Sequence, residues 1–222
     1  MAGEQLDGYS GHVEPDGPWQ DHIDGALLVR KLSVEEFNNN VYVIACRTTN
    51  TALVVDVAAR PERIREAIAG FNVTAAVQTH GHWDHVRAWE SLQHDPGLAV
   101  WGHPADNDLF PKPVDRALSG GDIIDVGELR VEVIHIAAHT PGSLLYLVEA
   151  DTRPHLFTGD TLFPGGHGKT TTPQDHVNIM DGLETKVFDR LADETWVYPG
   201  HGDDTTLGRE RPHLTEWRER GW

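Results

Sequence analysis

Apolar residues occur along most of the chain in short runs whose length and composition are typical of β-strands. ALLVRKL, which starts at residue 26, is followed by VYVIAC and ALVVDVA, all rich in branched aliphatic residues. RTTNT, between the last two runs, has the composition of a turn. A meander of strands is therefore predicted from residue 26 onward.

Helical segments interrupt these strands. Pro61 stands where a first helical turn tolerates proline, RIREAIA follows it, and Gly70 can close the helix in a left-handed conformation. A short helix is predicted at WESLQ, and a longer one begins near Thr172 and Pro173. HLTEWRER predicts a short C-terminal amphipathic helix, which could pack on its own domain or on another subunit.

The second half of the chain repeats the mixture of strands and helices. IIDVGELRVEVIHI predicts a hairpin about Gly127, and LLYLVEA, HLFTG and WVYP predict further strands. Strands in both halves with helices between them indicate an α/β (α+β) fold, with two sheets packed face to face and helices outside. Residues 1–25, rich in Gly, Asp and Pro, are expected to form a loosely ordered lead-in, and residues 26–222 a single domain.

Charge and cysteine content narrow the function. The net charge of −17 leaves no basic stripe for nucleic acid or an anionic membrane, so a small-molecule partner is expected. Cys46 is the only cysteine, which excludes an intrachain disulfide and a zinc site of four thiolates. Because neither a targeting signal nor a long apolar run is present, we expect a cytoplasmic protein. The sequence is compatible both with a monomer and with a homo-oligomer.

A cluster of metal-ligand residues follows the predicted strand VTAAVQT. THGHWDHV places His80, His82, Asp84 and His85 within one loop. In an extended segment His80 and His82 point to the same side, whereas Asp84 and His85, past the turn, can aim at a neighbouring position. Zinc accepts imidazole nitrogen and carboxylate oxygen, so one loop could serve two metal ions.

Three more candidate ligands stand at the ends of apolar runs, beside glycine or proline. AHTPGS supplies His139, FTGD supplies Asp160 and YPGHG supplies His201. The four loops could meet at one sheet edge. A chance cluster of solvated His and Asp is the alternative, but four motifs in this order favour a metal site.

These motifs resemble the metallo-β-lactamase superfamily, through THGHWDH, AHTPGS, TGD and PGHG in that order, over roughly residues 26–207. FTGDTLF and GGHGK are similar to the glyoxalase II-like (hydroxyacylglutathione hydrolase-like) group, which usually has Cys where His167 stands and an aromatic residue where Thr171 stands. The resemblance implies a four-layer αββα sandwich.

The resemblance also implies the ligand sets. The first metal ion would be bound by His80, His82 and His139. The second would be bound by Asp84, His85 and His201, with Asp160 bridging both ions. Two divalent metal ions per chain are therefore expected, with zinc as the first choice and iron or manganese as alternatives.

By the same resemblance, the expected reaction is hydrolysis of a thioester or related ester, in which a metal-bound hydroxide attacks the carbonyl while Asp84 orients it and accepts its proton. Lys169 and His167 would contact the substrate, or else lie in an exposed glycine-rich loop. Asp56 aligns with an aspartate of the superfamily that supports the metal-binding loop through hydrogen bonds. The alternative role for Asp56 is to cap the helix that begins at Pro61.

Two other functions compete with the zinc hydrolase. Persulfide dioxygenases of the same superfamily use one iron on the equivalents of His80, His139 and Asp160 and consume oxygen. A non-catalytic metal-binding module is the third candidate, although the ligand set is complete. Nucleic-acid-processing members are disfavoured by the acidity of the chain.

Overall fold

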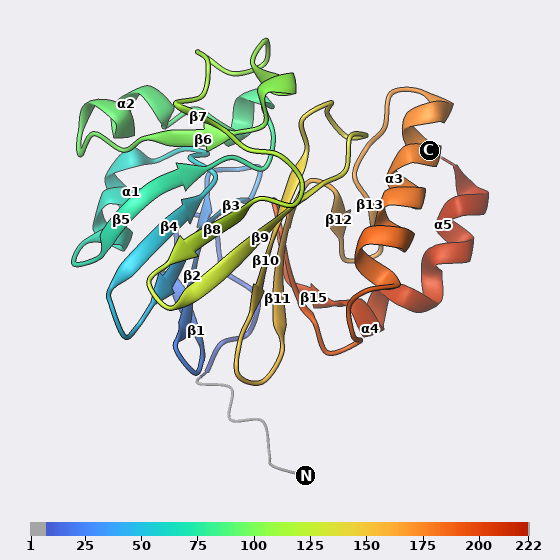
Figure 1. Cartoon of the computed structure of the whole chain (residues 1–222), viewed down its shortest axis with the longest axis horizontal. Coiled ribbons are helices and arrows are strands. Elements are labelled where there is room, and N and C mark those ends of the chain that lie inside the picture. The colour runs from blue at the N-terminus through green and yellow to red at the C-terminus, as the bar shows by residue number, and fades with distance from the viewer. Residues whose placement is uncertain (1–7, 222) are drawn as a thin grey trace.

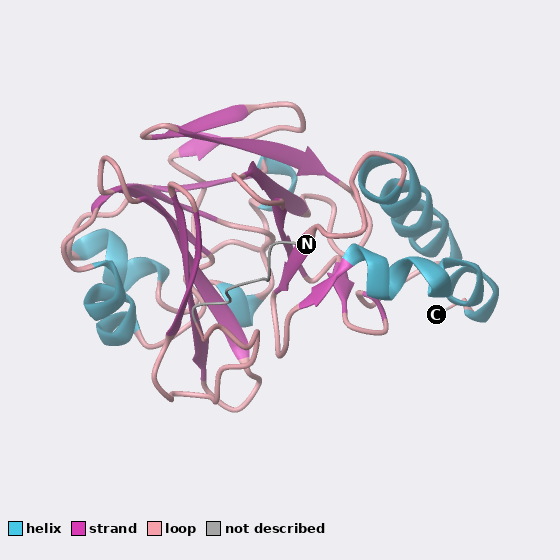
Figure 2. Cartoon of the chain, turned by 90° about the horizontal axis from the view of Figure 1, so that it is seen from below, coloured by secondary structure: helices cyan, strands magenta, loops and turns pink. Residues whose placement is uncertain are grey.

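Two β-sheets lie face to face at the centre of the molecule, and helices cover the outer face of each (Figures 1 and 2). This computed structural model describes residues 8–221. The arrangement confirms the predicted αββα sandwich.

The first sheet contains seven strands within the described residues, and they follow one another in sequence order. Strands β1 to β4 form the predicted antiparallel meander, and β4 to β7 run parallel because α1 and α2 return the chain between β4 and β6. The bounds are β1 (Gln20–Asp24), β2 (Leu27–Val34), β3 (Asn39–Cys46), β4 (Thr51–Val55), β5 (Asn72–Val77), β6 (Val100–Gly102) and β7 (Arg116–Ala117).

The second sheet has the order β15-β14-β11-β10-β9-β8, and β12 and β13 form a separate small hairpin. The predicted hairpin about Gly127 is confirmed, since β8 and β9 pair antiparallel and Gly127 has φ 63°. The bounds are β8 (Ile123–Val126), β9 (Leu129–His135), β10 (Leu144–Glu149), β11 (Pro154–Gly159), β12 (Leu162–Phe163), β13 (Gly166–His167), β14 (Trp196–Pro199) and β15 (Thr205–Thr206).

The helices begin where the sequence signals predict. Pro61 opens α1 and Gly70 follows its end with φ 88°, while Thr172 caps α3 in a reciprocal capping box with Asp175. The bounds are α1 (Pro61–Ile68), α2 (Trp89–His94), α3 (Pro173–Leu183), α4 (Leu207–Glu210) and α5 (Leu214–Arg220), with short turns η1 (Trp83–His85), η2 (Pro104–Asp106), η3 (Glu184–Phe188) and η4 (Arg211–His213). Within residues 8–221, no helix combines the length and apolar character needed to cross a membrane.

Three apolar layers hold the four structural layers together. Between the sheets, a core that includes Phe157 is fully buried. Ile64 and Trp89 pack α1 and α2 onto the first sheet, whereas Ile179 and Trp217 pack α3 and α5 onto the second. The predicted C-terminal helix therefore packs on its own domain.

The expected lead-in over residues 1–25 is wrong for residues 8–25. Strand β1 belongs to the first sheet, and the Tyr9 side chain, 3% exposed, donates its hydroxyl hydrogen bond to Asp204. Lys31 contacts the same carboxylate, with Nζ 2.6 Å from Asp204 Oδ1, and both side chains are fully buried. One aromatic ring and a polar network anchor this segment, so apolar periodicity did not reveal it. Residues 1–7 of the expected lead-in lie outside the described residues.

Candidate metal centre

The carboxyl ends of three strands deliver candidate ligands to one edge of the two sheets, and a fourth strand delivers Asp56 beside them. His80 follows β5 and Asp56 follows the parallel strand β4. Asp160 follows β11, and His201 follows the parallel strand β14. Parallel strands end at the same edge of a sheet, which is where open α/β sheets form their sites.

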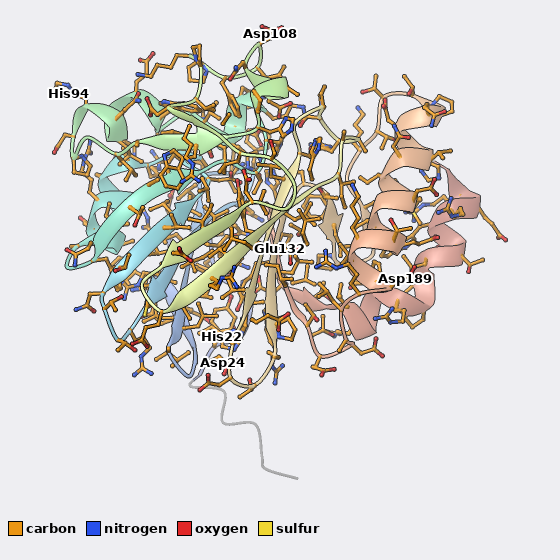
Figure 3. All side chains as sticks on the ribbon, in the orientation of Figure 1. His22, Asp24, His94, Asp108, Glu132 and Asp189 are labelled. Atoms are coloured by element: carbon orange, nitrogen blue, oxygen red, sulfur yellow. The ribbon has the colours of Figure 1, made fainter. Side chains whose placement is uncertain are left out.

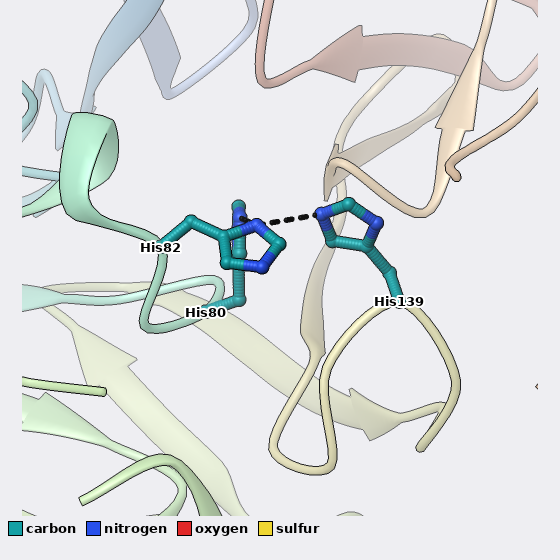
Figure 4. Close-up of side chains that lie close together, drawn as sticks. All are labelled: His80, His82 and His139. Atoms are coloured by element: carbon teal, nitrogen blue, oxygen red, sulfur yellow. Dashed lines mark hydrogen bonds between the residues drawn. The ribbon is translucent and has the colours of Figure 1, made fainter. Parts of the chain in front are cut away.

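The first group of imidazoles converges closely (Figure 4). His80 Nε2 lies 3.0 Å from His82 Nδ1, and His139 Nε2 lies 3.0 Å from the same His82 nitrogen. Ligands about 2.0–2.1 Å from a tetrahedral zinc ion lie about 3.3 Å apart. The three nitrogens therefore have the spacing of a zinc site, and we call these residues the first triad.

A second group lies beside it. His85 Nε2 is 3.1 Å from His201 Nε2, and Asp84 Oδ2 is 3.4 Å from the same His201 nitrogen and 3.8 Å from His85 Nε2. These three residues, the second triad, also have the spacing of a metal site.

Asp160 lies between the two triads. Its Oδ2 is 3.6 Å from His139 Nε2 and 3.5 Å from His201 Nε2, and its Oδ1 is 3.4 Å from His85 Nε2. Oδ1 is buried and has no hydrogen-bond partner in proper geometry among the described residues. A buried acceptor without a partner costs free energy, and a metal cation would satisfy it.

Gly200 makes room for this carboxylate. A Cβ atom at position 200 would overlap Asp160 Oδ1 and approach His85 Cε1 to 2.9 Å. We expect Gly200→Ala to displace Asp160 and weaken metal binding by at least about tenfold, the effect typical of disturbed ligand support. Competition with a chelator measures this affinity. Gly166→Ala, whose Cβ would meet only Arg220 Nη2 at 3.3 Å, is the control, and equal affinities of the two variants would contradict this interpretation.

The protonation of the two triads differs. Burial, aided by neighbouring imidazoles, lowers the pKa of His80 well below its usual range and lowers that of His82, so both imidazoles are neutral. Burial opposes charge on His201 too, but the carboxylates of Asp160 and Asp84 outweigh it and raise its pKa to about 9. Binding of a metal cation at the second triad would therefore displace protons.

Asp56 supports both triads. Its Oδ1 accepts the Thr79 N–H at 2.7 Å, and its Oδ2 accepts the Thr79 hydroxyl at 2.8 Å and lies 2.9 Å from His85 Nδ1. Helix α1 has Arg60 as its N-cap, so Asp56 does not cap that helix. In the structure, Asp56 therefore orients the loop that carries His80 and His85 and does not act as a helix cap.

Backbone and amide groups orient the remaining candidate ligands. His201 Nδ1 donates to the Phe37 carbonyl at 2.7 Å, which directs Nε2 towards the centre. His139 Nδ1 donates to the Lys169 carbonyl at 2.8 Å in the same way. The Asn39 amide donates to Asp84 Oδ2 at 3.0 Å.

The two predicted substrate residues lie beside the centre, not in it. The Lys169 side chain is exposed, and its residue contacts the centre through the backbone. His167 is half-buried and lines a cavity of about 530 Å³ together with Phe163 and Arg220. The Phe163 ring centroid is 6.3 Å from that of His201, so this cavity adjoins the second triad.

Asp106 is a further residue of the site that no sequence motif marks. It is 0% exposed, and its carboxylate accepts hydrogen bonds from the N–H groups of Gly81 and Gly142. Gly81 in HGH and Gly142 in TPG are the available signal that a side chain approaches the backbone there.

Comparison with known proteins agrees with this geometry. The family model "Metallo-beta-lactamase superfamily" matches residues 34–201. The chain is 29% identical to hydroxyacylglutathione hydrolase GloC of Haemophilus influenzae, over 83% of this chain and 95% of that protein. It is 32% identical to the probable hydroxyacylglutathione hydrolase glo2 of Schizosaccharomyces pombe, over 74% of this chain and 64% of that protein.

Among solved structures, that of ETHE1 from Myxococcus xanthus superposes with a TM-score of 0.72 at 28% identity, covering 86% of this chain and 84% of that chain. The family match spans three of the four loops with candidate ligands entirely and ends on His201, the candidate ligand of the fourth. The chain belongs to the metallo-β-lactamase superfamily.

Proposed function

We propose that this chain is a hydrolase with two metal ions, which cleaves a thioester or related ester of a small molecule. The observation that carries the proposal is the position of Asp160, whose carboxylate oxygens lie 3.4–3.6 Å from imidazole nitrogens of both triads. One carboxylate between two ligand sets fits a bridge between two cations. Zinc is the proposed metal, because imidazole and carboxylate form the donor set that it accepts in catalytic sites.

Bound divalent metal ions would supply a water of lowered pKa and a Lewis acid for the substrate carbonyl. Asp84 would orient that water by accepting a hydrogen bond from it. Burial opposes ionisation of Asp84, but its hydrogen bond with His201 holds its pKa well below the usual range, so the side chain accepts hydrogen bonds. Asn39 fixes one carboxylate oxygen, which leaves the other for the water.

The cavity beside the second triad is the proposed substrate site, with His167 on its wall and Lys169 at the adjoining loop. The H. influenzae relative is named for hydrolysis of hydroxyacylglutathione, which is a thioester. That name supports a thioester substrate for this chain. A thiolate leaving group also suits a zinc centre, since zinc binds sulfur well.

An iron-dependent persulfide dioxygenase is the second candidate. His80, His139 and Asp160 alone supply two imidazoles and a carboxylate, with Asp160 Oδ2 4.0 Å from His80 Nε2 and 3.6 Å from His139 Nε2. Two histidines and one carboxylate are the usual ligands of non-haem iron oxygenases. The second triad would have no role in such an enzyme, which favours the hydrolase.

Metal analysis and paired assays of the purified full chain separate these functions. The hydrolase requires two zinc ions per chain and thioester cleavage that is unchanged when oxygen is removed. One iron ion per chain with oxygen uptake on a persulfide would replace it with the dioxygenase. Metal binding without turnover of either substrate class would instead support the non-catalytic module.

A further inference from the structure

The Asp106 carboxylate lies between the two loops that carry the first triad. Its Oδ2 accepts the Gly81 N–H at 2.9 Å, and Gly81 stands between His80 and His82. The same oxygen accepts the hydroxyl of Thr140, the residue after His139, at 2.7 Å. One buried side chain therefore bonds to residues adjacent to all three imidazoles.

The third hydrogen bond of Asp106 is equally close. Oδ1 accepts the Gly142 N–H at 2.7 Å, so the carboxylate has two backbone donors and one hydroxyl donor. A Cβ atom at Gly142 would lie 2.6 Å from Asp106 Cγ, and one at Gly81 would lie 3.2 Å from Asp106 Cβ. Glycine at position 142 is therefore needed for this contact to form, whereas at Gly81 the shortest approach would be to Leu109 Cβ, at 2.6 Å.

The second triad depends on other groups. His85 contacts Asp56, and the His201 ring donates to the Phe37 carbonyl. Asp84 accepts from Asn39. Among the described residues, the hydrogen bonds of the Asp106 side chain go to Gly81, Thr140 and Gly142, and none goes to a residue of the second triad. Asp56, by contrast, reaches His85 directly and His80 through Thr79.

We propose that Asp106 is a positioning residue that sets the metal affinity of the first triad without affecting the second. This inference rests on the proposed function, since it presumes a metal ion at each triad. His82 Nδ1 and His139 Nε2 come from loops 57 residues apart in sequence and meet at 3.0 Å. Asp106 fixes that distance by holding both loops to one carboxylate. Without it, the imidazoles would have to order on metal binding, at a cost in conformational entropy.

The test is a metal titration of the full chain and of Asp106→Asn by chelator competition. Cobalt(II) is the probe, because its absorption reports the ligands around each ion. His82→Ala and His201→Ala, each lacking one ligand of one triad, supply the reference spectra for the two positions. We expect Asp106→Asn to lose first-triad affinity by about 10–100-fold. The metal affinity of the second triad should stay within about threefold of that of the unaltered chain. A general loss of structure would instead weaken metal binding at both triads.

Two control variants separate this effect from loss of stability. Asp108→Asn changes an exposed carboxylate two residues away (Figure 3) and should alter neither affinity. Asp24→Asn changes a buried carboxylate that accepts the Thr152 N–H and hydroxyl far from the centre, so it should lower stability and leave both affinities unchanged. If Asp106→Asn does not fold, Thr140→Val removes one of the three donors and should show a smaller loss at the same triad.

The same titration distinguishes failure of the proposed function from failure of the inference about Asp106. If the unaltered chain binds no metal ion with the first-triad spectrum, the proposed function fails. If it binds two ions and Asp106→Asn weakens both equally or neither, the inference about Asp106 is overturned while the proposed function stands.

Discussion

Asp160→Asn is expected to lower the rate of thioester hydrolysis about a thousandfold or more. The carboxylate lies within 3.6 Å of His85, His139 and His201, so it contacts both triads at once. An amide carries no charge and cannot bridge two cations. A metal ion contributes several kcal/mol of transition-state stabilisation, and each 1.36 kcal/mol is a factor of ten in rate.

Steady-state kinetics on a thioester, with metal content measured on the same samples, checks this expectation. Asp203→Asn is the matched control: it follows His201 by two residues, its side chain is 62% exposed, and its contact is with His12. A variant at position 160 with more than a tenth of the original kcat and two bound metal ions would show that the bridge is unnecessary.

Lys31→Met is expected to cause the largest loss of stability, about 3–5 kcal/mol, because it leaves the buried charge of Asp204 without its counter-ion. Lys31 Nζ donates to Asp204 Oδ1 at 2.6 Å and to the carbonyls of Gly11 and Gly202 at 2.8 and 2.7 Å. Both side chains of the ion pair have no exposed surface. Urea unfolding of the metal-free protein gives the free energy of unfolding without a contribution from metal binding.

The loss should shrink as the pH falls. Burial raises the pKa of Asp204 in the folded protein, although Lys31 counteracts it. Because the folded pKa is raised, protonated Asp204 stabilises the fold at low pH, and this contribution disappears as the pH rises through the folded pKa. Removing Lys31 raises that pKa further, so the difference from the unaltered protein should be smaller at pH 5 than at pH 8.

A second substitution tests the cause. Lys31→Met combined with Asp204→Asn removes both charges, and we expect it to recover a large part of the stability. A double variant as unstable as Lys31→Met would mean that the lost bonds to Gly11 and Gly202, not the unpaired carboxylate, carry the effect.

Much of the fold could be predicted from local signals. The capping residues Thr172 and Pro173, the start at Pro61 and the turn glycine Gly127 each act within a few residues, so they locate α3, α1 and the β8–β9 hairpin. The N-terminal segment could not be found in this way. Tyr9 is buried by contact with Asp204, 195 residues later, and such pairing leaves no local pattern.

In the candidate site, too, local motifs could be predicted from the sequence but contacts between distant residues could not. Ligand residues cluster in motifs because a metal ion requires several donors within a few ångströms, so His80 and His82 are visible in the sequence. Of the residues that support them, Asp56 is expected from the resemblance, but Asp106 is not. Asp106 lies 25 residues from Gly81 and 36 from Gly142, in a polar stretch where aspartate is ordinary. Only the folded arrangement shows that this carboxylate joins the two loops.

The central claim is that two metal ions occupy the two triads with Asp160 between them. Anomalous diffraction at the zinc absorption edge, from crystals of the zinc-loaded protein, tests it most directly. We predict two peaks about 3.5–4 Å apart, the spacing of two-metal sites. One peak should contact His80, His82 and His139, the other Asp84, His85 and His201, and both should contact Asp160. A single peak held by His80, His139 and Asp160, with none at His201, would contradict the claim.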